Sequence, residues 1–381
     1  MPTIQDAIGA LQAQDYSTAR DVCTTLADTE PHARYLLASM ISHGQGVPAD
    51  PVSAATHYRL AADAGHPIAR HCLGGLYAAG RGVPQDHSQA AIWFRLAADD
   101  GFPDAMVRLG LAHTKGEGVP VDPIAAMTWW ERAAARGSGP AMMLIGRAHA
   151  TGPGGAPPDP GLAAEWFFKA WQAGENEAEQ EIIRTRVALE AAANAGSATA
   201  QNALGLIYCF GYDDPATATD WFEQAAIQNH PEALRMLGYL LSEGKGVEKD
   251  EALAAEFYQR AANLGDTFAQ LNFAAMTDRG AGGLTRDISV AIKWFRRAAD
   301  GGMTEANLRL AELLAERNRD RRDANEAIQR LMKVAKDGPP DAEYRIDAGD
   351  GSWAVGLKEQ GRLVAMPGLR MEELVGLPDD D

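Results

Sequence analysis

Two consecutive stretches decide the fold of this chain: ARHCLGGLYAAGRGVPQDHSQAAIWFRLAADDGFP, from Ala69 to Pro103, and AMVRLGLAHTKGEGVPVDPIAAMTWWERAAARGSGP, from Ala105 to Pro140. The two stretches match at nearly every structural position. The pair Leu73-Gly74 of the first returns in the second as Leu109-Gly110, 36 residues further on. Self-similarity at one such period is typical of an array of stacked helical repeats.

The same two marks recur along most of the chain. The Leu-Gly pair or a close variant stands at Leu37-Ala38, Leu73-Gly74, Leu109-Gly110, Ile145-Gly146, Leu204-Gly205, Leu237-Gly238, Phe273-Ala274 and Leu310-Ala311. A Gly-x-Gly-Val turn stands at 44–47, 80–83, 116–119 and 244–247. These marks indicate seven or eight copies, with an atypical copy at each end.

Each copy is predicted to be a pair of helices. The first carries apolar residues at i, i+4 and i+8 up to Tyr77, as one face of a helix does. It is expected to stop at Gly80, because glycine tolerates the left-handed conformation of a helix C-terminus. Asp86 is a candidate N-cap for the second helix, which ends near Gly101. One pair cannot bury its own apolar face, so neighbouring pairs must stack.

The motifs A-x-x-x-L-G-x-x-Y, G-x-G-V-x-x-D and A-x-x-W-Y/F-x-x-A-A-x-x-G resemble those of the Sel-1-like repeat family, a branch of the tetratricopeptide superfamily. The resemblance covers about residues 31 to 310. It implies an all-α, right-handed α/α superhelical solenoid of helix-turn-helix repeats that serves as an adaptor or scaffold. It names no particular partner.

Five segments are expected along the chain. Residues 1–30 form N-terminal capping helices, and residues 31–174 hold repeats 1 to 4. Residues 175–197 form one long helix where a pair is expected, an irregular helical seam; the sequence leaves open whether it divides the array in two. Residues 198–337 hold further repeats and a charged helical cap. Residues 338–381 form a tail with a small β-hairpin, built from 352–357 and 362–366.

Composition excludes several classes of function. The net charge is −17 and the pI is near 5.0, which disfavours binding to nucleic acid. The sequence contains no apolar run of the roughly 20 residues that span a bilayer and begins without a signal peptide, so a cytoplasmic location is predicted. Cys23, Cys72 and Cys209 are spaced for neither a disulfide framework nor a zinc site and are expected as buried, reduced thiols.

No catalytic residue, metal site or cofactor is predicted. Ser242 and Lys245 have the Ser-x-x-Lys spacing of penicillin-recognising enzymes, but they coincide with the turn that ends a first helix. His113 and His149 occupy the Tyr77 position of their copies, and His66 and His230 lie in equivalent turns before proline, so packing roles are expected. The Trp/Phe pairs that recur with the repeat are expected in the core.

The superfamily displays its first helices on the concave face, so residues that flank the Leu-Gly pair are expected in the groove. The candidate partner-binding residues are Tyr35, Ser39, His71, Lys115, Met143, Arg147, Asn202, Phe210, Arg235, Tyr239, Asp278 and Arg279.

The sequence therefore predicts an adaptor or scaffold, not an enzyme, that binds a protein or peptide in this groove. Two alternatives remain open: a non-catalytic accessory subunit of an enzyme, and an inhibitory, immunity-type subunit acting through a localised acidic surface. A Ser-x-x-Lys hydrolase ranks last. The sequence leaves the oligomeric state open.

Overall fold

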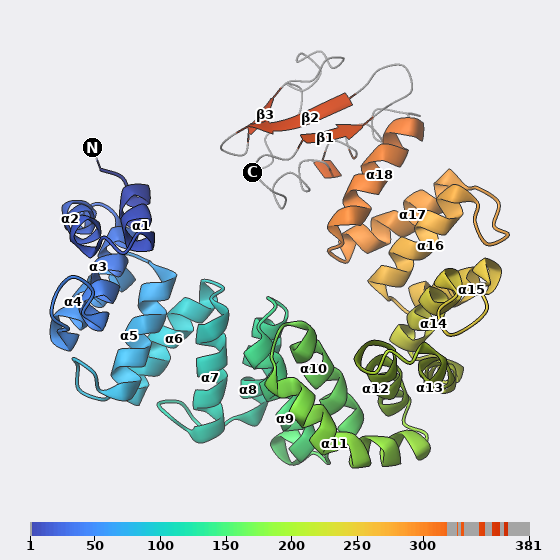
Figure 1. Cartoon of the computed structure of the whole chain (residues 1–381), viewed down its shortest axis with the longest axis horizontal. Coiled ribbons are helices and arrows are strands. Elements are labelled where there is room, and N and C mark those ends of the chain that lie inside the picture. The colour runs from blue at the N-terminus through green and yellow to red at the C-terminus, as the bar shows by residue number, and fades with distance from the viewer. Residues whose placement is uncertain are drawn as a thin grey trace. The chain divides into compact units, whose positions relative to one another are not determined.

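A computed structural model (Figure 1) describes residues 2–317, residues 326, 329 and 330, and three strands of the tail. The chain divides into two compact units, unit 1 (Met1–Ala191) and unit 2 (Ala192–Asp381). The boundary falls inside the long helix α11 (Glu177–Asn194), which occupies most of the predicted seam.

Unit 1 consists of helices that pair in chain order, and each second helix also packs against the first helix of the next pair. The helices are α1 (Ile4–Gln12), α2 (Tyr16–Leu26), α3 (Pro31–His43), α4 (Pro51–Asp63), α5 (Pro67–Ala79), α6 (His87–Asp99), α7 (Pro103–Lys115), α8 (Pro123–Ala134), α9 (Gly139–Thr151), a short 3-10 turn η1 (Pro153–Gly155) and α10 (Pro160–Gln172).

Unit 2 continues with pairs of the same kind. Its helices are α12 (Ala198–Leu206), the π-helix η2 (Ile207–Gly211), α13 (Pro215–Ile227), α14 (Pro231–Glu243), α15 (Glu251–Asn263), α16 (Thr267–Arg279), α17 (Ile288–Asp300) and α18 (Thr304–Arg317). The π-helix stands where four other repeats have the Gly-x-Gly-Val turn, and this repeat is shorter there.

The four Gly-x-Gly-Val turns have the predicted chemistry, as the turn between α5 and α6 illustrates. Gly80 ends α5 in the left-handed region, at φ +66°, and the Asp86 side chain accepts a hydrogen bond from the Gln89 N–H at 3.0 Å. Gly82, at φ +71°, has a second function. A Cβ atom there would lie 1.9 Å from the Pro51 carbonyl oxygen, at the start of α4. The turn of one repeat therefore rests directly on the backbone of the repeat before it.

The glycine of the Leu-Gly pair creates room for a ring on the second helix of the same pair. A Cβ atom on Gly74 would lie 2.8 Å from the Phe94 ring, and one on Gly110 would lie 2.2 Å from Nε1 of Trp130. The glycine of the pair therefore leaves space for an aromatic side chain of the second helix.

Most rings of the aromatic pairs lie in the core, as predicted. The second ring is buried in each pair: Phe94, Trp130, Phe167, Phe222 and Phe295. The first rings Trp93 and Trp294 are buried too, whereas Trp129 and Trp166 are half-buried, each beneath a cation three residues later on the same helix. Arg132 lies 4.2 Å from the centroid of Trp129, and Lys169 lies 4.6 Å from that of Trp166.

A recurring hydrogen bond joins consecutive pairs. Three residues before the Leu-Gly position, a long polar side chain donates to a carbonyl at the end of the preceding helix. The donors and acceptors are Arg34 to Ala27 O, Arg70 to Ala62 O, Gln201 to Ala193 O and Gln270 to Ala262 O, at 2.7, 3.1, 3.0 and 3.2 Å. The last carbonyls of a helix have no partner within the helix. The last three of these acceptors also take the N–H of a turn glycine, so the side chain adds a second hydrogen bond that ties the two helices together.

The tail contains strands β1 (Glu343–Ile346), β2 (Trp353–Lys358) and β3 (Arg362–Val364), paired antiparallel in the order β1-β2-β3. The hairpin predicted from the sequence falls on β2 and β3. The rest of the predicted tail lies outside the described residues.

Candidate functional site

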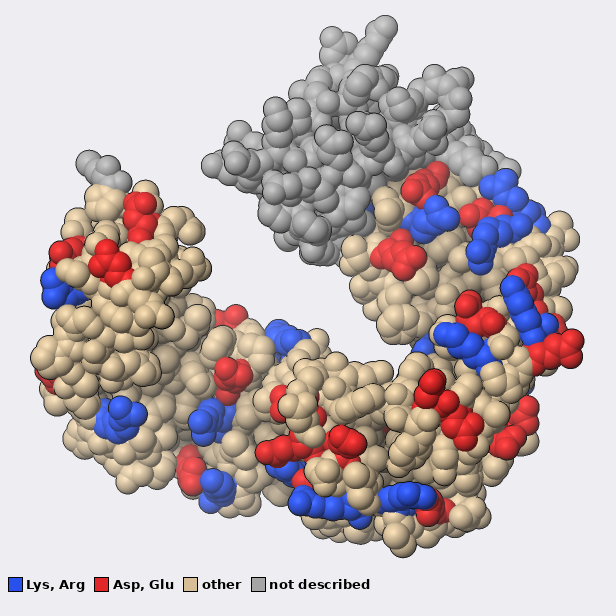
Figure 2. Space-filling model, viewed as in Figure 1, with Lys and Arg blue, Asp and Glu red and all other residues tan. Residues whose placement is uncertain are grey.

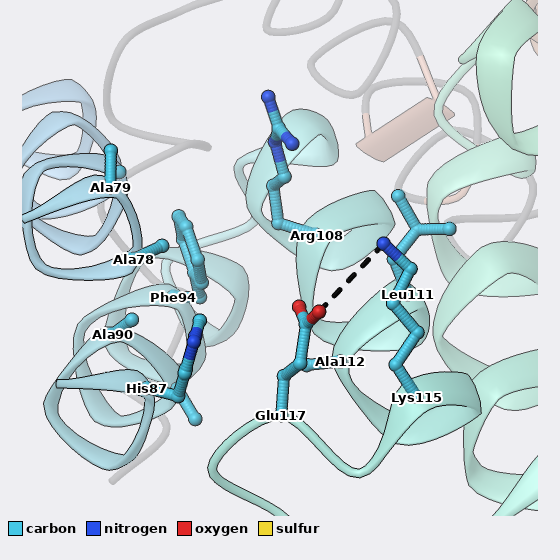
Figure 3. Close-up of a pocket in the computed structure, with 12 residues that line it drawn as sticks. Ala78, Ala79, His87, Ala90, Phe94, Arg108, Leu111, Ala112, Lys115 and Glu117 are labelled. Carbon is cyan, nitrogen blue, oxygen red and sulfur yellow. Dashed lines mark ion pairs between the residues drawn. The ribbon is translucent and has the colours of Figure 1, made fainter. Parts of the chain in front are cut away.

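The main candidate site is a pocket in unit 1 between the first helices α5 and α7, with the second helix α6 as its floor. We name it pocket A; it is a cavity of about 260 Å³. Figure 3 shows Arg108, Leu111 and Lys115 projecting from α7 on one side. Its lining is Gly75, Ala78, Ala79, His87, Ala90, Ala91, Phe94, Arg108, Leu111, Ala112, Lys115 and Glu117.

The walls of pocket A are small or apolar, and the charge at its rim is mainly positive. Glu117 lies 3.8 Å from Lys115 and partly neutralises it. Arg108 is exposed, and the structure pairs it with no carboxylate among the described residues. Arg108 therefore supplies the uncompensated charge at this site. A guanidinium beside an apolar floor suits a carboxylate on a short side chain.

A second pocket lies on the other side of α7. Pocket B lies between α7 and α9, with α8 as its floor and the start of η1 at one end, and its volume is about 410 Å³. Its lining is Leu111, Thr114, Pro123, Met127, Trp130, Leu144, Arg147, Ala148, Thr151, Gly152, Pro153 and Gly154. Leu111 belongs to both pockets, so the two are immediate neighbours.

Two of the twelve groove candidates from the sequence are wrong, because their side chains are buried. Met143 is 5 % exposed and packs with Phe167, Ala170 and Ala178 of the following helices. Asn202 is 0 % exposed, and its Nδ2 donates to Glu232 Oε2 at 3.1 Å. Both lie two residues before the Leu-Gly position, on a side that later helices cover: α10 and α11 for Met143, and α14 for Asn202.

Other candidates are engaged in contacts within their unit. Tyr35 stacks on His66 with ring centroids 4.7 Å apart, and His71 contacts the rings of Phe94 and Phe102. The same holds for three candidates of unit 2. Arg235 pairs with Glu232 and Asp266, Tyr239 accepts from Lys245, and Asp278 pairs with Arg286.

The remaining candidates are Ser39, which is half-buried, and Lys115, Arg147, Phe210 and Arg279, which are exposed. Among all twelve, Lys115 lines pocket A and Arg147 lines pocket B. Arg147 is held by Glu181 at 3.0 Å and Glu177 at 3.2 Å on α11.

Arg108 is the residue that the sequence reasoning missed. Helical spacing could have found it: positions 108, 111, 112 and 115 follow the i, i+3, i+4, i+7 pattern of one face, and Lys115 was already a candidate. The projection instead took residues two before, two after, and five or six after the first residue of the Leu-Gly pair, and passed over the residue directly before it.

Ser242 and Lys245 do not form a catalytic pair. The Ser242 hydroxyl donates to the Tyr239 carbonyl of its own helix at 2.9 Å, and Lys245 Nζ donates to the Tyr239 hydroxyl at 2.5 Å. This bond to Tyr239 raises the pKa of Lys245, whereas a lysine that acts as a base needs a lowered pKa.

The histidines serve the backbone and the packing. His66 and His230 cap α5 and α14, where their Nδ1 atoms accept from the N–H groups of Ala69 and Ala233. His113 is buried, and its Nδ1 lies 3.2 Å from the Pro120 carbonyl. In the described part of the chain, no three His, Cys, Asp or Glu side chains are grouped to hold a metal ion.

Three further features of the sequence analysis can be compared with the described residues: the cysteines, a membrane-spanning helix and a localised acidic surface. Cys23, Cys72 and Cys209 are free thiols; Cys23 is buried, while the other two are only half-buried. No helix among the described residues is both long and apolar enough to cross a membrane. On the face that Figure 2 shows, acidic and basic side chains are interspersed over the coloured residues of unit 1, so this face lends no support to a localised acidic surface.

The model of the Sel1 repeat matches seven consecutive segments, at 31–66, 68–102, 103–138, 139–175, 198–230, 231–266 and 267–303. The chain belongs to the Sel1 repeat family. Proteins built from Sel1 repeats typically mediate protein–protein interaction. The seven Sel1 repeats correspond to the helix pairs from α3 to α17, and α11 lies in the gap between the fourth and fifth.

Solved structures with Sel1-like folds resemble this chain. A protective antigen of uropathogenic Escherichia coli that displays an SLR fold is 28% identical, with a TM-score of 0.41 over 84% of this chain and 72% of that one. A Sel1 repeat protein from Oxalobacter formigenes is 27% identical, with a TM-score of 0.43 over 69% of this chain and 100% of that one.

An immunity protein from Pseudomonas aeruginosa is 20% identical, with a TM-score of 0.27 over 62% of this chain and 82% of that one. No protein with a curated function matches the chain.

Proposed function

We propose that this Sel1 repeat protein is a scaffold that binds an extended segment of a partner protein across the first-helix face of unit 1. In this proposal, pocket A takes an acidic side chain of that segment. The observation that carries the proposal is Arg108, an exposed arginine at the rim of an apolar-walled pocket, with no carboxylate paired to it among the described residues.

The physical argument concerns the net charge at the pocket. An aspartate or glutamate entering pocket A meets the guanidinium of Arg108 while its methylene groups contact Phe94 and the alanines around it. Charge-assisted hydrogen bonds of this kind are among the stronger ones in proteins. Lys115 adds attraction at longer range, reduced by Glu117.

The test uses the purified full chain and a phage-displayed library of random twelve-residue peptides as the probe. A peptide that the wild type selects is labelled, and its dissociation constant is measured by fluorescence anisotropy. We expect Arg108→Glu to weaken binding about tenfold or more, which corresponds to a loss of at least about 1.4 kcal/mol.

The matched control is Arg95→Glu. Arg95 is also an exposed arginine, but it lies on the second helix α6 and does not line either pocket. The control makes the same change in net charge and should leave the affinity within about twofold. Equal losses of affinity in both variants would mean that the overall charge causes the effect, and they would contradict the proposed site.

A further inference from the structure

Pockets A and B are the same structural feature in two consecutive repeats. Ten of the twelve lining residues of one pocket correspond to lining residues of the other at a distance of one 36-residue period. On the floor, His87, Ala91 and Phe94 correspond to Pro123, Met127 and Trp130. On the walls, Arg108, Leu111 and Lys115 correspond to Leu144, Arg147 and Thr151. The backbone geometry is therefore repeated, while the side-chain chemistry changes.

The change converts a cationic pocket into an apolar one. Leu144 stands where pocket A has Arg108, and Thr151 stands where it has Lys115. The single cation of pocket B, Arg147, is paired with two glutamates on α11. The floor is apolar as well, because Trp130 Nε1 donates inward to the Val107 carbonyl at 3.4 Å.

Pocket B is also the larger of the two, and its enclosing loop is specific to this repeat. The Gly-Pro-rich segment that contains η1 replaces the Gly-x-Gly-Val turn, and Gly154 approaches Pro123 of α8. Apolar cavities of about 150 Å³ already hold a benzene ring. A pocket of about 410 Å³ therefore has room for a large side chain.

We propose that pocket B is a second side-chain site, which takes a bulky aliphatic or aromatic residue of the same extended segment whose acidic residue occupies pocket A. This inference rests on the proposed function. Because Leu111 lines both pockets, a few residues of extended chain, at about 3.3 Å each, bridge them. The partner is thus recognised by an acidic and a bulky apolar residue at a fixed short spacing.

The difference between the two repeats at equivalent positions 108 and 144 provides the test. Arg108→Leu and Leu144→Arg each introduce the residue that the neighbouring repeat carries at the same position, so the local backbone is suited to both. The same random twelve-residue library is selected on the wild type and on each variant, and thermal unfolding followed by circular dichroism shows whether each variant is folded.

We expect the wild type to select peptides with one acidic and one bulky apolar residue at a fixed spacing. Arg108→Leu should replace the acidic preference with a second apolar one, and Leu144→Arg should replace the apolar preference with a second acidic one. Selected peptides without a fixed apolar position, or an apolar position that Leu144→Arg leaves unchanged, would overturn the role of pocket B. If Arg108→Leu still shifted the acidic preference, the proposed function would stand.

A second variant covers the case in which Leu144→Arg does not fold. Thr151 is exposed at the rim of pocket B, so Thr151→Trp fills the pocket from outside without altering the core. It should lower the affinity for the wild-type peptide at least tenfold and remove the apolar preference. Unchanged affinity and an unchanged preference would equally overturn the inference.

Discussion

His32 Nδ1 and His66 Nε2 lie 2.9 Å apart at the junction of the first two Sel1 repeats. The backbone N–H of Ala69 donates to His66 Nδ1 at 3.2 Å, so Nδ1 carries no proton. Neutral His66 then carries its proton on Nε2 and donates it to His32 Nδ1. Tyr35 stacks on the His66 ring and shields the contact. Protonation of His66 at Nδ1 breaks its hydrogen bond with the Ala69 N–H.

Stability should therefore fall in mild acid. Burial, with a smaller contribution from His32, lowers the pKa of His66 to about 4, against about 6.5 in an unfolded chain. Between these values the unfolded chain binds more protons than the folded one, so the unfolding free energy rises with pH. Stability is complete above about pH 6.5 and is lost as the pH falls toward 4. Urea unfolding measured at several pH values gives the slope of the unfolding free energy against pH and checks this prediction.

The control for this prediction is His66→Ser, because Ser138 caps the equivalent helix α9 through its side chain. The variant should keep the cap and show a shallower slope between pH 4 and 6.5. Some slope should remain, since burial also lowers the pKa values of His57, His71 and His149. A slope identical to that of the wild type would contradict the role of His66.

Replacement of two adjacent glycines of α5 by alanine should change the unfolding free energy in opposite directions. Gly74→Ala places a Cβ atom 2.8 Å from the buried Phe94 ring and 3.2 Å from the Ala90 carbonyl, and such overpacking costs about 1–3 kcal/mol. Gly75→Ala meets nothing within 4 Å and should stabilise the helix by about 0.5–1 kcal/mol. Thermal and urea unfolding of both variants measure the difference. Similar changes in the unfolding free energy of the two variants would mean that the Phe94 ring moves to accept the Cβ atom.

Two alanine substitutions separate the cost of the contact between Gly82 and the Pro51 backbone from the cost of the left-handed conformation. Gly82 and Gly137 both have positive φ, at +71° and +82°, but only Gly82 meets a neighbour. Gly137→Ala should cost about 1–2 kcal/mol, the penalty of that conformation alone. Gly82→Ala should cost clearly more, because its Cβ atom collides with the Pro51 carbonyl. Equal losses in unfolding free energy would show that this contact between repeats yields easily.

Replacing Arg70, whose side chain donates to the preceding repeat, by another donor should change the unfolding free energy little. Replacing it by a side chain without a donor should lower that free energy more. Arg70→Gln keeps a donor that Gln201 and Gln270 use at the same position, so it should cost less than about 1 kcal/mol. The exposed pair with Asp100, which it loses, contributes little. Arg70→Met removes the side-chain donor, so the Ala62 carbonyl keeps only the Gly65 N–H, and it should cost about 0.5–1.5 kcal/mol more than Arg70→Gln. Urea unfolding of both variants checks the order, and the reverse order would contradict it.

Much of the fold was predictable because its determinants are local and recur with the repeat. The left-handed Gly80 and the N-cap Asp86 depend on a few neighbouring residues, and both were assigned correctly. Met143 and Asn202 were misplaced for the opposite reason. Whether their side of the first helix faces solvent depends on helices later in the chain, which cover it.

The candidate site was predictable only in part. Lys115 and Arg147 were chosen, and each lines a pocket, but the pockets are formed by three helices from two repeats. The sequence cannot show that Arg147 is paired while Arg108 is not, because the pairing glutamates come from the irregular helix α11.

The sequence by itself determined the period, the pairing of helices and the turn chemistry, since each follows from residues close together in the chain. Only the tertiary structure decided which side chains the stacking of repeats buries, and which cation it leaves free beside an apolar pocket. Burial and charge compensation depend on neighbours that are about 30 or more residues away in the sequence, as Arg147 and Glu181 are.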